Sequence, residues 1–67
     1  VQLQANNSGA WKTIARFDAG DVEADRRIKI GAILIRQADS TVTFRIATVE
    51  ALPSVLMRMN NDQWVEV

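Results

Sequence analysis

The sequence contains no cysteine and no histidine, and only one proline and three glycines among its 67 residues. Without cysteine no disulfide can form, and without either residue the chain has no thiolate or imidazole ligand for zinc. Catalysis by a thiol or an imidazole is excluded for the same reason. The lack of cysteine also favours the reducing environment of the cytoplasm. We therefore expect no cofactor and no catalytic centre of these types.

The chain also lacks an excess charge and a long apolar run. Eight Lys and Arg residues balance eight Asp and Glu residues, so the bulk attraction that draws nucleic-acid binders to phosphates is absent. The longest nearly apolar stretch, residues 30–35, is far shorter than the roughly 20 residues of a membrane span. Residues 1–10 have no basic segment and no apolar run, so we expect no signal peptide, no membrane contact and a cytoplasmic location. Val1 rather than Met stands first, which leaves a longer precursor open.

The length permits one domain, residues 1–67, and the apolar fraction of 48% is typical of a globular chain. A domain of this size buries only about 60% of the surface that its unfolded chain exposes. Small folds usually gain stability from disulfides, a metal or oligomerisation. Because the first two lack the residues they need, the sequence predicts a homo-oligomer or a chain that docks on a protein partner.

An alternating pattern at the N-terminus predicts a β-hairpin, residues 1–6 with 10–18. Apolar and polar residues alternate from Val1 to Asn6, and the turn-forming run 6–9 follows. The alternation returns at Trp11, which puts Trp11 and Phe17 on one face. Lys12 and Arg16 then fall on the other face.

Residues 19–38 predict a helix. Acidic residues come first and basic residues follow, an order that complements the helix dipole. Asp18 is the expected N-cap. Ion pairs at i,i+4 are expected for Glu23 with Arg27 and for Asp25 with Lys29. The stripe expected to face the core is Ala24, Ile28, Gly31, Ala32 and Ile35.

A strand over residues 26–37 is the alternative, because four isoleucines in eight residues suit a strand and Gly31 weakens a helix. That alternative predicts an all-β barrel or sandwich. We favour the helix, since the cap, the dipole and the pair spacing agree. On a helix, Ile30 and Ile33 lie off the core stripe, and we expect a partner subunit to cover them.

Three further strands complete the predicted fold. The residues from 41 to 49 alternate clearly, Pro53 breaks the pattern, and strands follow at 55–59 and 64–67 around a turn at 60–62. The resulting order is β-β-α-β-β-β. It predicts a small α+β domain with one mainly antiparallel sheet and one helix on one face.

The polar groups offer no catalytic or metal site. Asp18, Asp21, Glu23 and Asp25 form the densest acidic group, but their spacing does not match a calcium loop, and they suit a helix start better. The serines have no histidine base, and no phosphate-binding glycine motif occurs. We therefore predict that the chain is not an enzyme.

Strand parity gathers basic residues on the sheet face away from the helix. Lys12, Arg16, Arg45 and Arg58 are candidate contacts for an anion or a nucleic acid, beside Gln2, Gln4, Thr41 and Thr43. Trp64 is the aromatic residue then available to stack on a base. An ordinary solvated face of an antiparallel sheet explains the same pattern.

The sequence thus predicts a non-enzymatic interaction or assembly module that self-associates. Its candidate interface residues are Ile30, Ile33, Met57, Met59 and Trp64. The alternative is weak nucleic-acid binding through the cation-bearing face, which the zero net charge disfavours.

Overall fold

The segments in which apolar and polar residues alternate form strands, and the segment whose charge order matches a helix dipole forms a helix. The computed structural model describes residues 1–67. Its elements are β1 (Gln2–Asn6), β2 (Lys12–Arg16), α1 (Val22–Ala38), β3 (Thr43–Ala47), β4 (Val55–Asn60) and β5 (Gln63–Glu66). The order and the α+β class are confirmed. Residues 26–37 are helical, so the all-β alternative is wrong.

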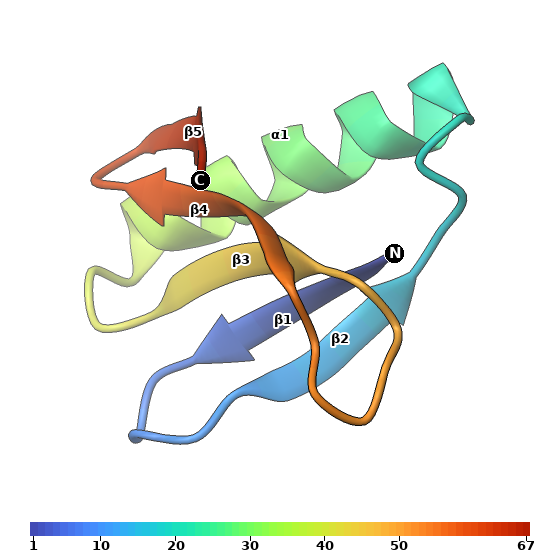
Figure 1. The fold of residues 1–67 in the computed structure, drawn as a ribbon. Helices are drawn as coiled ribbons and strands as arrows, with labels where there is room; N and C mark the ends of the chain where they lie inside the picture. Colours follow the sequence, from blue (N-terminus) through green and yellow to red (C-terminus); the bar gives the residue numbers. More distant parts are fainter.

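The five strands form one antiparallel sheet in the order β2-β1-β3-β4-β5. Because β2 and β3 both flank β1, the connection through α1 must pass across one face of the sheet. Figure 1 shows α1 lying along that face, while the link from β3 to β4 passes in front of β1 and β2 on the opposite side. We call the side away from α1 the open face.

The core lies between α1 and the sheet. It consists of Leu3, Ala32, Val42, Phe44, Ile46 and Met59. Ala32 and Phe44 are each only 2% exposed. Alanine at the centre of the helix face lets the helix approach the sheet closely, where the ring of Phe44 fills the space. Only 9 of 67 residues are buried, so each core side chain carries a large share of the packing.

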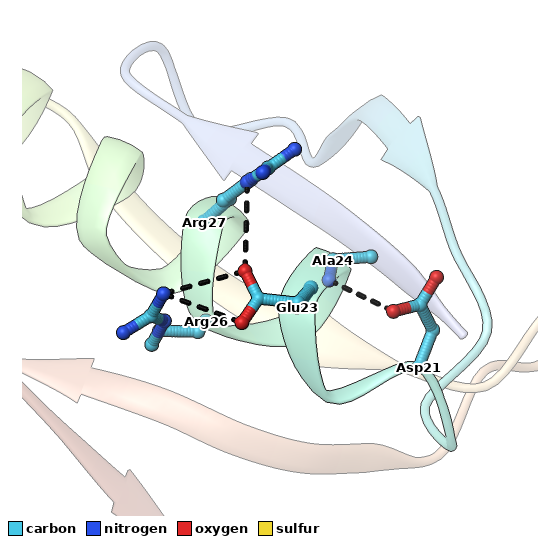
Figure 2. A network of polar contacts seen from close by, with 5 residues as sticks. All are labelled: Asp21, Glu23, Ala24, Arg26 and Arg27. Atoms are coloured by element: carbon cyan, nitrogen blue, oxygen red, sulfur yellow. Dashed lines mark hydrogen bonds and ion pairs between the residues drawn. The ribbon is translucent and has the colours of Figure 1, made fainter.

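Asp21 caps α1. Its side chain accepts a hydrogen bond from the Ala24 N–H at 3.2 Å, as Figure 2 shows. The prediction of Asp18 as the cap is wrong, because the Asp18 carboxylate instead accepts from the Gly20 N–H at 2.8 Å. That bond forms a local turn, and the helix begins after it.

The predicted ion pairs of the helix are present. The Lys29 Nζ lies 3.0 Å from Asp25 Oδ2, and the Arg27 Nε lies 3.8 Å from Glu23 Oε2. Figure 2 shows the Glu23 carboxylate paired with both Arg26 and Arg27. Ion pairs at this helix spacing contribute only a few tenths of a kcal/mol each. They favour the helix over the strand without deciding the stability of the fold.

Replacing Asp21 by alanine is expected to lower the free energy of unfolding by about 0.5–2 kcal/mol, because the first turn of α1 loses its cap. Urea denaturation followed by circular dichroism measures this loss. Asp18→Ala is the matched control, since it removes an exposed turn bond and leaves the cap intact. Equal losses in the two variants would show that the cap does not stabilise the helix.

The helix faces the sheet through most of the predicted stripe, with Ile33 in place of Ile35. Ile28, Ala32 and Ile33 pack on the core, whereas Ile35 is 52% exposed. Ile33 is therefore covered within the chain, and the expectation that it lies off the core is wrong. The indole N–H of Trp64 donates to the Lys29 carbonyl at 3.0 Å, which holds the Lys29–Ile33 side of the helix against β5.

A β-bulge changes the parity of the first hairpin. Leu3 pairs with Ala15, but Gln4 pairs with Thr13, so Ile14 is an extra residue on β2. Lys12 consequently pairs with Ala5, which packs against the core. The predicted placement of Lys12 on the open face is wrong, because strict alternation does not continue through the bulge. The same extra residue places Trp11 on the open face, whereas strict alternation predicts that Trp11 faces the core.

Candidate functional site

Three arginines share the open face. Arg16 lies opposite Gln2, Arg45 lies opposite Gln4, and Arg58 lies opposite Arg45 in the strand register. Directly paired residues on neighbouring strands point to the same side. The structure thus brings together three of the four cations that the sequence assigned to one face, with Lys12 on the side of α1.

Arg45 is held in a fixed position at the centre of this face. Its guanidinium carbon lies 4.2 Å from the centroid of the Trp11 ring, a cation–π contact. Its Nε–H donates to Gln4 Oε1 at 2.7 Å. The two terminal nitrogens of Arg45 form no hydrogen bond within the chain, so their four N–H groups are free to bind a ligand.

The arginines of the open face have no carboxylate partner. All ion pairs of the chain join side chains of α1, namely Arg26 and Arg27 with Glu23, and Lys29 with Asp25. Arg45 and Arg58 stand directly opposite each other, and like charges in that position destabilise a sheet. The fold therefore holds two cations opposite each other without a carboxylate of the chain between them.

A shallow hollow of about 370 Å³ lies beside this pair. Its lining includes Trp11, Thr43, Arg45, Val55 and Arg58. The hollow thus combines two guanidinium groups with an aromatic ring and apolar side chains. Its volume falls within the range of small-molecule sites, and its chemistry suits a ligand with an anionic group and a flat ring.

The two glutamines of β1 are buried beneath the open face, where they hydrogen-bond to neighbouring residues. Gln2 is 5% exposed and Gln4 is 7% exposed. The Gln2 amide donates to the Thr48 carbonyl at 2.9 Å and its oxygen accepts from the Thr13 hydroxyl at 2.6 Å. No buried side-chain nitrogen or oxygen in the chain lacks a partner. The arginines therefore supply the charged donors of the open face.

Trp11, not Trp64, is the aromatic residue of the open face. Trp64 pairs with the core residue Met59 and reaches α1 through its indole N–H. Because of the bulge at Ile14, Trp11 lies on the same face as the arginines. The local sequence shows no glycine or proline there that would have signalled the extra residue.

The candidate interface residues do not form one exposed surface. Met59 is 8% exposed in the core, and Ile33, Met57 and Trp64 pack against that core. Only Ile30 is half exposed, at 50%. Apolar side chains that are more exposed than Ile30 include Ile14, Leu34, Ile35 and Leu52, none of which was a candidate interface residue.

The acidic residues near the start of α1 make separate contacts and do not form one cluster. Asp21 caps the helix, and Glu23 and Asp25 pair with cations of α1. No three acidic side chains gather closely enough to hold a metal ion. Among the titratable groups, hydrogen bonds from the Thr41 hydroxyl and N–H lower the pKa of Asp39.

The single helix is not long and apolar enough to cross a membrane. Comparison with family models, with curated protein sequences and with solved structures finds no match for this chain. What the chain does must therefore be inferred from its own surfaces.

Proposed function

We propose that the chain is a non-enzymatic binding module whose open face binds single-stranded nucleic acid. The observation that carries the proposal is the cross-strand pair Arg45–Arg58, which lacks a carboxylate partner and lies beside Trp11. A cytoplasmic location, which the sequence favours, brings such a face into contact with RNA.

The chemistry of this face matches a nucleotide. A phosphate between Arg45 and Arg58 accepts charge-assisted hydrogen bonds from both guanidinium groups and relieves their repulsion. A base then stacks on the Trp11 ring or on the guanidinium plane of Arg45. Stacking needs an unpaired base, because a duplex hides the faces of its bases. This favours a single strand over a duplex.

The zero net charge does not oppose local binding. Four of the eight acidic residues lie between residues 18 and 25, at the start of α1. The neutral sum therefore averages an acidic helix start with a basic sheet face. Three arginine contacts to single-stranded phosphates predict a slope of log affinity against log salt of about −2, and hence modest affinity.

Fluorescence anisotropy with labelled oligo-dT and oligo-U tests the proposal. Binding at 50 mM salt with a slope of about −2 is expected. Trp11→Ala is expected to weaken binding roughly fivefold to a hundredfold, because each base stack contributes about 1–3 kcal/mol. Arg45→Ala removes the central cation and is expected to weaken binding at least as much.

The matched control is Arg26→Ala, which removes an arginine of α1 that is paired with Glu23. This variant should bind like the parent chain. Absence of binding at 50 mM salt would overturn the proposal. Equal effects of Arg26→Ala and Arg45→Ala would show that binding follows bulk charge and not the open face.

Self-association is a second candidate function, and a specific observation favours it. Nine large apolar side chains are at least 43% exposed: Ile14, Val22, Ile30, Leu34, Ile35, Val49, Leu52, Leu56 and Val67. Against a core of six residues, this is much apolar surface for a small domain. A second copy of the chain can cover part of it.

A further inference from the structure

The hollow on the open face presents two positive charges and no acidic side chain. Arg45 and Arg58 are the only ionisable side chains that line it, and neither forms an ion pair. Val67, the last residue of the sequence, also lines the hollow, but its carboxylate pairs with neither arginine. The two guanidinium groups therefore offer two uncompensated charges to a ligand.

The hydrogen-bond donors of this pair converge on one place. The Nε–H of Arg45 is taken by Gln4 Oε1 at 2.7 Å, and its guanidinium lies against the Trp11 ring. These contacts fix the group and leave its two terminal nitrogens for a ligand. Arg58 is exposed and stands directly opposite in the strand register. One phosphate can therefore accept from both guanidinium groups, and such charge-assisted bonds are the strong ones.

The open face carries a single aromatic ring. Of the four aromatic residues, Phe17 and Trp64 pack against the core and Phe44 is buried in it, which leaves Trp11. Sites that follow a strand over many nucleotides stack successive bases on several rings. One ring beside a hollow of about 370 Å³ instead suits one base and one phosphate.

We infer that the open face binds a phosphorylated end of a nucleic-acid strand in preference to the phosphates within the strand. The inference rests on the proposed binding of single strands and names the part of the strand that the site selects. A terminal phosphomonoester carries about −1.5 to −2 charges at pH 7 and three acceptor oxygens, so it balances both arginines. An internal phosphodiester carries one negative charge and leaves one guanidinium uncompensated.

Fluorescence anisotropy at pH 7.5 and 50 mM salt tests the inference with four forms of one oligo-dT, each labelled on an internal base. The first has hydroxyl groups at both ends, the second a 5′-phosphate, the third a 3′-phosphate and the fourth a 5′-phosphate blocked as its methyl ester. At least one of the two phosphomonoesters should bind at least fivefold tighter than the hydroxyl form, and this comparison identifies the end. The methyl ester should bind like the hydroxyl form, because it carries only one charge.

The preference for the phosphorylated end should depend on Arg58. Arg58→Ala leaves Arg45 as the only cation of the hollow, so the affinity ratio of phosphorylated to hydroxyl strand should fall to about one. Arg16→Ala is the matched control, since Arg16 lies on the same face but opposite Gln2. It should weaken binding of both strands alike and keep their ratio. Arg58→Gln serves in place of Arg58→Ala if circular dichroism shows that the latter is unfolded.

Lowering the pH supplies a test that needs no substitution. The second ionisation of a phosphomonoester has a pKa of about 6, so at pH 5.5 most terminal phosphates carry one charge. Arginine stays charged in this range, and the chain has no histidine. The affinity ratio of phosphorylated to hydroxyl strand should therefore decrease between pH 7.5 and pH 5.5. A ratio that stays the same would contradict the charge match on which the inference rests.

The remaining outcomes separate this inference from the proposed function. Equal binding of all four oligonucleotides at pH 7.5 would leave single-strand binding standing and overturn the preference for an end. No binding of any of them would overturn both. A neutral peptide with one phosphoserine is the last probe. If it bound as tightly as the phosphorylated strand, the base would contribute nothing, and a phosphopeptide would replace the nucleic-acid end as the ligand.

Discussion

Replacing Phe44 by alanine is expected to remove about 3–5 kcal/mol, a large share of the free energy of unfolding of this chain. Phe44 is 2% exposed and belongs to a core of only six buried residues. Truncating a buried phenylalanine to alanine typically costs about 3–5 kcal/mol. The whole stability of a 67-residue domain is roughly 3–10 kcal/mol. No disulfide is present to hold a weakened fold together.

Circular dichroism and urea denaturation measure the effect of Phe44→Ala. Phe44→Leu is the matched control, because it keeps most of the side-chain volume and is expected to cost less than about 1.5 kcal/mol. If Phe44→Ala were as stable as Phe44→Leu, the space around residue 44 would have to collapse without loss, contrary to a close-packed core.

The element order was predictable because the local patterns agree with the fold. Alternation marks the strands, and the acid-first charge order with its i,i+4 pairs marks α1. The start of the helix was less predictable, since Asp18 and Asp21 are both suitable caps. The bond from the Gly20 N–H to Asp18 commits that residue to a turn, and Asp21 is left to cap the helix.

Which face of each helix or strand is buried was harder to predict, because tertiary contacts determine it. Ile33 was expected outside the core, but the hydrogen bond from Trp64 to the Lys29 carbonyl turns that side of α1 toward β5. Lys12 and Trp11 exchange faces because Ile14 is an extra residue in the hairpin. Neither feature has a signal in the local pattern of the sequence.

The bulge has a consequence for the candidate site. Strict alternation would have placed Trp11 in the core and Lys12 among the arginines, giving a basic face without an aromatic ring. The observed register places the ring under Arg45 and removes one lysine from the face. The site therefore gains a stacking group, which counts for more in single-strand binding than one further solvated charge.

Replacing Arg58 by glutamate is expected to raise stability and abolish binding in the same molecule. The substitution converts the like-charge pair with Arg45 into an opposite-charge pair across β3 and β4. Relief of the repulsion and formation of the cross-strand ion pair should together add roughly 0.2–1 kcal/mol to the free energy of unfolding. The new carboxylate also occupies Arg45 and repels phosphate, so affinity for oligo-dT at 50 mM salt should fall at least tenfold.

Arg16→Glu is the matched control for this experiment. Arg16 lies on the same face but stands opposite Gln2, not opposite another arginine. Its replacement should weaken binding without the gain in stability that Arg58→Glu produces. Urea denaturation and anisotropy on the same samples give both quantities.

The opposite signs of the two effects distinguish a ligand-binding face from an ordinary solvated one. On a solvated face, Arg58→Glu would raise stability and there would be no affinity to lose. A loss of stability in this variant would instead mean that the arginine side chain supports the fold by packing, as long charged side chains often do. A gain in stability together with a loss of affinity is the result expected if the Arg45–Arg58 pair binds the anion.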